Sequence, residues 1–240
     1  METINPIVTQ WCEKALEDPQ QFWSEAATKL HWFRKWDHIY QDNSPTFKWF
    51  SGGLTNLSYN CLDHHVNNGW GGHAAIAYAN ERGGRQILTY STLLHRVKEA
   101  SAALRGMGVT KGDRITIYMP VCPEALILML AIVRIGAIHS VVFGGFASNE
   151  LASRIDDSKA KILVTASCGF EPGRTVEYKP LVDLALKLAS HKIERLILFQ
   201  RIGHEVKLNT PKEISWDEAL SNARPVDCVE MNSNEFAYIL

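Results

Sequence analysis

From about residue 86 onward, short apolar runs alternate with stretches of helical periodicity, and this alternation constrains the fold more than any other feature. The runs are nearly continuous, as is typical of strands buried on both faces, and they lie at 114–119, 137–143, 161–166 and 195–200. Before the first run, Leu93, Val97 and Leu104 recur at helical spacing and predict one apolar helix face. Strands that alternate with helices in this way favour right-handed crossovers. The sequence therefore predicts an α/β fold with a mostly parallel sheet flanked by helices.

The later helices are expected to begin at residues with recognisable capping roles. Pro123 suits the first turn of a helix that ends near residue 135. Ser148 is expected to cap the next helix, and Pro180 to begin the one after it. Ser215 and Glu218 have the spacing of a capping box, which predicts a short helix after residue 215.

The first 70 residues differ in character from the rest of the chain. They hold six of the seven tryptophans, namely Trp11, Trp23, Trp32, Trp36, Trp49 and Trp70. Two helices are predicted here, over residues 9–17 and 19–30, with little regular signal after them. We expect an aromatic-rich, largely helical N-terminal extension (1–70) that wraps around the body formed by residues 71–240, because large rings supply contact area.

Charge and cysteine usage exclude several classes of protein. Twenty-five Lys and Arg against 26 Asp and Glu give a net charge of −1, so no overall field attracts nucleic acid or an anionic membrane. The five cysteines form no C-x-x-C pair and suggest neither a disulfide framework nor a metal site, which favours a reducing compartment. The N-terminus resembles neither a signal nor a transit peptide, and no apolar run could span a bilayer. A cytoplasmic location is predicted.

One candidate binding loop follows the apolar run 137–143. Gly144 and Gly145 would let a ligand approach the backbone, and the next helix offers free N–H groups to an anion. A tight turn without a ligand explains the same residues. Neither G-x-G-x-x-G nor a P-loop motif is present, which disfavours a Rossmann dehydrogenase.

A second candidate loop, 167–174, follows the run 161–166. Its last residue, Arg174, could place a guanidinium beside a phosphate and donate two hydrogen bonds to it. The alternative is that Arg174 pairs with Glu171 or Glu177 at the surface. The spacing alone does not separate these two interpretations.

Other reactive side chains are better explained as structural. Cys168 has no identifiable base partner and is expected to be a small loop residue rather than a nucleophile. His139 lies inside an apolar run and is expected to be a hydrogen-bonded core residue. The glycine-rich segment 82–85 predicts the tip of a hairpin, with a phosphate role as a minor alternative.

Several segments together resemble the AMP-forming short-chain acyl-CoA synthetases, the acetyl- and propionyl-CoA synthetase group of the adenylate-forming superfamily. The resemblance covers about residues 11–240, and 143–146 with the residues before it is its most specific part. The N-terminal extension resembles that group's own. The matching segments are Trp49-Phe50, residues 56–65, Leu88-Thr89-Tyr90, and residues 108–120, 134–146 and 153–157.

The resemblance implies a two-step reaction. In this family a carboxylate attacks the α-phosphorus of ATP to give an acyl-adenylate and pyrophosphate, and the CoA thiolate then displaces AMP. The resemblance also implies that the phosphate loop, the Mg²⁺ carboxylate, the acyl pocket and the catalytic lysine would follow residue 240. We therefore expect a chain truncated before the phosphate loop and inactive in isolation, with no catalytic residue of its own. The missing remainder of the enzyme would be its partner.

What the resemblance carries onto this chain is the CoA side of the site. The segment Glu171-Pro172-Gly173-Arg174 aligns with one that contacts the nucleotide end of CoA and is often Arg-Gly-Gly-Arg. Arg174 retains the last basic residue, and Gly144 and Gly145 would let the CoA adenine lie against the backbone. Glu171 departs from the pattern by replacing a basic residue. The segment looks more like the propionyl-preferring branch, but it does not fix the acid that is activated.

The residues at the end of the chain support a second hypothesis. Residues 236–240 are apolar and predict a strand at an exposed sheet edge, which would invite self-association or a partner strand. The chain could then be a non-catalytic binding or interaction module derived from such an enzyme.

Overall fold

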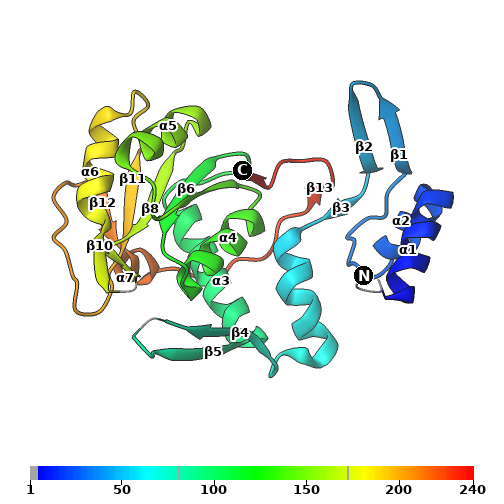
Figure 1. Ribbon diagram of the computed structural model, residues 1–240, viewed down its shortest axis with the longest axis horizontal. Coiled ribbons are helices and arrows are strands. Elements are labelled where there is room, and N and C mark those ends of the chain that lie inside the picture. Colours follow the sequence, from blue (N-terminus) through cyan, green and yellow to red (C-terminus); the bar gives the residue numbers. More distant parts are fainter. Residues whose placement is uncertain (1–4, 81, 172) are drawn as a thin grey trace.

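A six-stranded parallel sheet forms the body of the molecule (Figure 1). The computed structural model describes residues 5–80, 82–171 and 173–240. The strand order is β12-β11-β8-β6-β7-β14, and every neighbouring pair is parallel. The strands are β6 (Arg114–Met119), β7 (Ile138–Phe143), β8 (Ile162–Ala166), β11 (Arg195–Phe199), β12 (Glu213–Ser215) and β14 (Tyr238–Ile239). The predicted α/β fold is confirmed, and the four apolar runs correspond to its four inner strands, β6, β7, β8 and β11.

Helices pack in pairs on the two faces of this sheet. α3 (Tyr90–Gly106) lies against α4 (Pro123–Arg134), and α5 (Ser148–Ser158) lies against α6 (Tyr178–Leu188). The short α7 (Trp216–Leu220) packs beside α3 and β11. The two pairs lie on opposite faces because β6-α4-β7 and β7-α5-β8 run across the sheet in opposite directions with the same hand.

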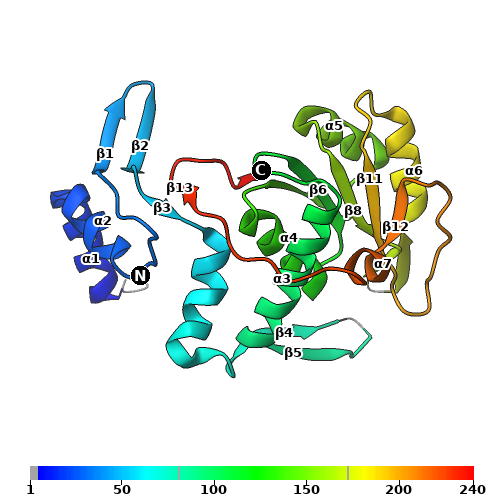
Figure 2. The ribbon, with the colours of Figure 1, turned by 180° about the vertical axis from the view of Figure 1, so that it is seen from behind.

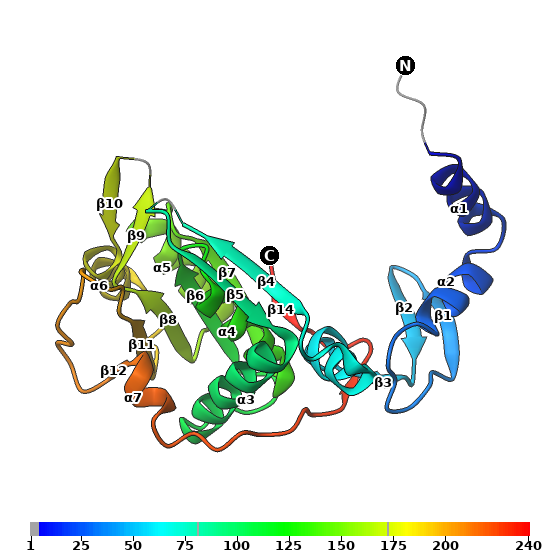
Figure 3. The same ribbon diagram turned by 90° about the horizontal axis from the view of Figure 1, so that it is seen from below.

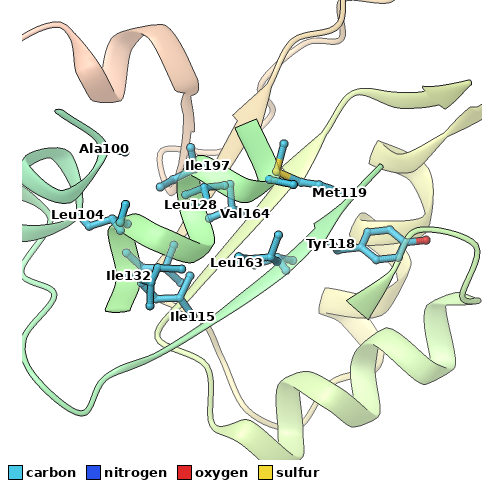
Figure 4. Close-up of a cluster of buried hydrophobic side chains, with 14 of the residues drawn as sticks. Ala100, Leu104, Ile115, Tyr118, Met119, Leu128, Ile132, Leu163, Val164 and Ile197 are labelled. Atoms are coloured by element: carbon cyan, nitrogen blue, oxygen red, sulfur yellow. The ribbon is translucent and has the colours of Figure 1, made fainter. Parts of the chain in front are cut away.

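The main hydrophobic core lies between the α3–α4 layer and the sheet (Figure 4). Leu128 and Ile132 of α4 belong to this cluster together with Ile115 of β6, and all three side chains are fully buried. Burial of a Leu or Ile side chain is worth about 1.5–3 kcal/mol, so this layer contributes strongly to folding.

Two of the expected helix starts are shifted in the structure. Ala147, not Ser148, is the N-cap residue of α5, and Ser148 is a buried residue of the first turn. α6 begins at Tyr178, two residues before Pro180, since the first turn of a helix tolerates proline. The capping interaction at Ser215 is confirmed, because its hydroxyl accepts a hydrogen bond from the Glu218 N–H.

Two hairpins stand at the margin of the sheet. β4 (Ala74–Ala79) and β5 (Arg85–Thr89) pair antiparallel, which confirms the predicted hairpin tip. The segment expected to be a loop after β8 is instead largely a second hairpin, formed by β9 (Cys168–Glu171) and β10 (Arg174–Glu177). Period-2 alternation is too short in these four-residue strands to predict them.

The N-terminal extension projects from one side of the body (Figure 1). It comprises α1 (Pro6–Glu17), α2 (Pro19–Ala27) and the hairpin of β1 (His38–Asn43) and β2 (Thr46–Ser51). Its rings pack on one another, for example Trp32 on Trp36 and on Phe50. The expectation that it wraps the body is wrong for these elements. Aromatic residues lack a periodic pattern here, so the sequence did not show that they pack mainly among themselves.

A short connecting region joins this extension to the body. β3 (Leu54–Thr55) pairs with β13 (Met231–Asn232) from the end of the chain, as Figure 2 shows from behind. Two π-helical turns, Tyr59–Asp63 and Val66–Trp70, then pack against α3. The Asn56 side chain donates to the carbonyls of Val133 and Val229 and so ties this region to α4 and to the C-terminal segment.

The predicted terminal strand is present as β14 and lies at the sheet edge next to β7. Only Tyr238 and Ile239 pair with β7, opposite His139 and Ser140. Half of Tyr238 is exposed. In the part of the chain that the structure describes, no strand pairs with the other side of β14. The same described residues include no helix long and apolar enough to cross a membrane.

Candidate functional site: the carboxyl edge of the sheet

Both predicted loops lie at the carboxyl edge of the sheet, where ligands bind in open α/β folds. Gly144 and Gly145 follow the end of β7, and the β9–β10 hairpin follows the end of β8. β6 and β8 are neighbours and β7 lies beside β6, so the two loops come from strands two positions apart. The sequence predicts that each loop follows its own strand. Only the strand order shows that the two loops lie near one another at the same edge of the sheet.

The ring of Tyr178, the first residue of α6, lies between the two loops. A Cβ atom at Gly144 would overlap the Tyr178 hydroxyl, and a Cβ at Gly169 would lie 2.5 Å from the same oxygen. Tyr178 is buried beside Tyr118, with ring centroids 5.0 Å apart. Burial, with a smaller effect from Tyr118, raises the pKa of Tyr178 to about 12, so its hydroxyl stays protonated. Glycine at 144 and 169 therefore makes room for this ring.

Tyr118 fixes the turn that follows β7. Its hydroxyl donates to the carbonyl oxygens of Phe146, at 2.8 Å, and Gly144, at 3.2 Å. Gly145 packs against the ring of Phe143, where a Cβ would meet a ring carbon at 2.7 Å. The Tyr118 hydroxyl thus holds the turn on the side that faces the core. The side chains of Phe143 and Phe146 remain accessible to solvent.

Arg174 forms an ion pair with Glu171 across the β9–β10 hairpin. Its Nε donates to Glu171 Oε2 at 2.7 Å, and its Nη2 lies 2.6 Å from the same oxygen. The Arg174 side chain is 71% exposed, so the pair stands in solvent. This is the surface pairing left open by the sequence. Gly173 adopts a positive φ of 75° at the hairpin tip, and Pro172 lies outside the described residues.

Cys168 and His139, which the sequence predicts to be structural residues, are both shielded from solvent to some degree. Burial raises the pKa of the Cys168 thiol, which lowers its thiolate fraction and agrees with a structural role. His139 is not the hydrogen-bonded residue that we expected. Its Nδ1 is buried without a partner among the described residues, and its ring stacks on Tyr238 with centroids 5.6 Å apart. Burial lowers the pKa of His139 to about 4.

Sequence reasoning missed a cluster of cationic and aromatic side chains at this edge. Arg82, at the tip of the β4–β5 hairpin, lies over the ring of Phe170 from β9, and Arg201 approaches the same ring from the end of β11. The segment 82–85 is predicted to be a hairpin tip, with a phosphate role as a minor alternative. No local pattern signals that this tip reaches a strand about 90 residues further along the chain.

The described residues offer no set of ligands for a metal ion. They contain no group of three or more His, Cys, Asp or Glu side chains close enough to hold one. The donors present therefore do not fit a Mg²⁺ ion, whose carboxylate the resemblance implies only after residue 240.

Comparison with known proteins agrees with this architecture. The family model described as "AMP-binding enzyme" matches residues 62–240, and the one described as "Acetyl-coenzyme A synthetase N-terminus" matches residues 8–61. A solved acetoacetyl-CoA synthetase from Streptomyces lividans shares the fold with a TM-score of 0.84 at 18% identity, over 94% of this chain and 34% of that one. The chain belongs to the AMP-binding enzyme family.

Among curated relatives, the similarity is to short-chain acyl-CoA synthetases, as the resemblance predicted. The human "Acyl-CoA synthetase short-chain family member 3, mitochondrial" is 43% identical over 94% of this chain and 33% of its own length. An "Acetyl-coenzyme A synthetase" of Rubrobacter xylanophilus is 43% identical over 95% of this chain and 36% of its own. A "3-hydroxypropionyl-coenzyme A synthetase" of Sulfurisphaera tokodaii is 38% identical over 95% and 35%.

The chain thus spans about a third of the length of these relatives. The two matched family models meet between residues 61 and 62, in the connecting region, and the predicted boundary at residue 70 stays a prediction. The cytoplasmic location stays a prediction, and the name of the human relative places that protein in mitochondria.

Proposed function

We propose that this chain is the N-terminal portion of an AMP-forming short-chain acyl-CoA synthetase and supplies part of its CoA site. In the complete enzyme, the carboxylate of a short acid such as acetate or propionate attacks the α-phosphorus of ATP. An acyl-adenylate forms and pyrophosphate leaves. The CoA thiolate then attacks the acyl carbon, and AMP leaves with the electron pair of the broken C–O bond. Mg²⁺, the ATP contacts and the acyl pocket belong to the remainder of the enzyme in this proposal.

The observation that carries the proposal is the meeting of the two predicted loops at Tyr178. The strand order brings the turn after β7 and the Arg174 hairpin to one edge of the sheet, where the Tyr178 ring lies against Gly144 and Gly169. Arg174 is the residue proposed to bind a phosphate of CoA, and Glu171, Pro172 and Gly173 are the other residues of the proposed segment. The CoA adenine is proposed to lie against the backbone of Gly144 and Gly145, on the solvent-facing side of the turn.

The present pairing of Arg174 does not oppose this role. An exposed ion pair is worth only about 0–1 kcal/mol, whereas a charge-assisted hydrogen bond to a phosphate is worth about 1.5–3 kcal/mol. Arg174 can therefore leave Glu171 at small cost when a phosphate is near. Glu171 would then act as a competitor that weakens CoA binding.

Two substitutions in the full-length enzyme test this assignment. Arg174→Ala should raise the KM for CoA about tenfold or more, while the KM for ATP stays unchanged. Glu171→Gln should lower the KM for CoA, because it removes the competitor. An unchanged KM for CoA in Arg174→Ala would exclude Arg174 from the site.

A second candidate function is suggested by the free edge of β14. Tyr238 is half exposed and Ile239 is 38% exposed beside an unpaired strand edge, an arrangement that favours strand addition. The isolated chain would then act as an interaction module. Pyrophosphate release with acetate or propionate, ATP and CoA decides whether the 240-residue chain is a self-sufficient enzyme or a fragment. We expect no turnover by the 240-residue chain, and measurable release would contradict the proposal that it lacks the activating machinery.

A further inference from the structure

Arg82 and Arg201 converge on one aromatic ring although they come from distant parts of the chain. The guanidinium carbon of Arg82 lies 3.7 Å from the centre of the Phe170 ring, and that of Arg201 lies 4.8 Å from it. The tip of the β4–β5 hairpin and β9 lie side by side in Figure 3. A guanidinium that stacks on a ring contacts it with its flat face. Its N–H groups lie in the guanidinium plane and can still donate hydrogen bonds.

These side chains border a cavity of about 290 Å³ at the carboxyl edge of the sheet. The cavity lies between the β4–β5 hairpin, the ends of β6 and β11, and the first turn of α4. Pro123 and Glu124 of that turn line it, so the positive end of a 12-residue helix adjoins the two arginines. The volume is close to the lower end of that found for small-molecule sites.

Arg201 is the unusual member of this group. It is only 9% exposed, and a guanidinium is a cation with five N–H donors. No carboxylate among the described residues lies within 4.0 Å of it as an ion pair, and no hydrogen bond from its guanidinium is present within the same ranges. Burying an unpaired charge is costly, so a cation left facing a cavity favours an anionic occupant.

Arg82 is partly engaged by its neighbours. Its Nη2 donates to Thr175 Oγ1 at 3.2 Å and lies 3.3 Å from His204 Nε2. These contacts fix the direction of the side chain without neutralising its charge. Glu124 is a carboxylate on the cavity wall, so two arginines face one acid among the lining residues that the structure describes.

We propose that Arg82 and Arg201, held against Phe170, bind a phosphate group in this cavity. The planar fork of arginine matches the oxygens of a phosphate, and two pre-oriented forks match a dianion better than one. The site is distinct from Arg174, which does not line this cavity. The phosphate has two sources, either the free ions phosphate and pyrophosphate or a phosphate group of CoA. The site itself does not depend on the proposed function.

Titration calorimetry on the 240-residue chain tests the site with inorganic phosphate and pyrophosphate as probes. Arg82→Gln should weaken binding about fivefold or more, and Arg201→Lys about tenfold, because each removes charge-assisted hydrogen bonds. Arg85→Gln is the matched control. It removes the same charge from the same hairpin at an exposed position that does not line the cavity. Glu124→Gln should tighten binding by removing the opposing charge.

The same variants identify the source of the phosphate. If CoA binds the chain and dephospho-CoA binds at least about tenfold more weakly, with the difference lost in Arg82→Gln, the group belongs to CoA. If only the free ions respond to the substitutions, they are the ligand. Arg82 is exposed, so Arg82→Gln should leave the fold intact, and thermal unfolding checks this for each variant. Equal effects of Arg82→Gln and Arg85→Gln, or no detectable binding of any probe, would overturn the proposal.

Discussion

Arg134 and Asp63 form a buried, two-pronged ion pair that joins the connecting region to the main helical layer. Arg134 Nη1 lies 2.7 Å from Asp63 Oδ2, and its Nη2 lies 2.9 Å from Oδ1. The side chains are only 1% and 10% exposed. Arg134 Nε also donates to the Val226 carbonyl at 3.1 Å, so this last residue of α4 holds three parts of the chain together.

The first prediction concerns this pair. Asp63→Asn leaves the Arg134 charge buried without a counter-charge, so the free energy of unfolding should fall by about 3–5 kcal/mol. Urea denaturation followed by circular dichroism measures the loss. Glu235→Gln is the control, because its partner Lys111 is exposed and such a pair contributes only about 0–1 kcal/mol. Similar losses in both variants would contradict the assigned role of the buried pair.

The second prediction tests the contact between the two loops of the candidate site. Gly144→Ala places a methyl group against the Tyr178 hydroxyl and should destabilise the protein by about 1–3 kcal/mol. The double variant Gly144→Ala with Tyr178→Phe should recover part of the loss, because the clashing oxygen is removed. Gly106→Ala, which meets no atom within 4 Å, should be neutral or stabilising. A double variant no more stable than Gly144→Ala alone would show that the hydroxyl is not the obstacle.

The third prediction is a pH dependence from His139. Its pKa of about 4 in the folded state lies below the ordinary value of 6.5. Between pH 4 and pH 6.5, His139 is therefore protonated in the unfolded chain and neutral in the folded protein. This contribution is fully present above pH 6.5 and is lost as the pH falls towards 4, by about 3 kcal/mol at most.

His139→Phe keeps the stacking on Tyr238 and should remove this slope, as urea midpoints at several pH values will measure. His95→Gln removes an exposed histidine and should leave the slope unchanged. A slope that persists in His139→Phe would assign the effect to another group.

The fourth prediction compares two leucines of α4. Leu128 is fully buried against the sheet, whereas Leu126 is 39% exposed. Leu128→Ala should destabilise by about 2–5 kcal/mol through lost burial and the cavity left behind. Leu126→Ala should cost clearly less, and thermal melts of the two variants will show the difference. Equal costs would mean that α4 is not oriented as described.

The local pattern of the sequence determined the four inner strands of the sheet and the order of the strands and helices around them. The continuous apolar runs identified β6, β7, β8 and β11, because strands buried on both faces have no polar side to show. The expected span 114–119 coincides with β6. The resemblance in the segments around residues 56–65 and 134–146 indicated the family, since those residues are specific in kind and spacing.

Only the tertiary structure decided which residues meet. Tyr178 lies between two loops because the strand order brings them to one edge, and the Arg82 guanidinium reaches Phe170 because a hairpin folds across that edge. Asp63 and Arg134 are 71 positions apart and pair because the connecting region packs on the helical layer. Hydrophobic periodicity indicates which face of a helix or strand is buried. Contacts between residues far apart in the sequence depend on how the crossovers and hairpins are arranged, and no local pattern encodes that arrangement.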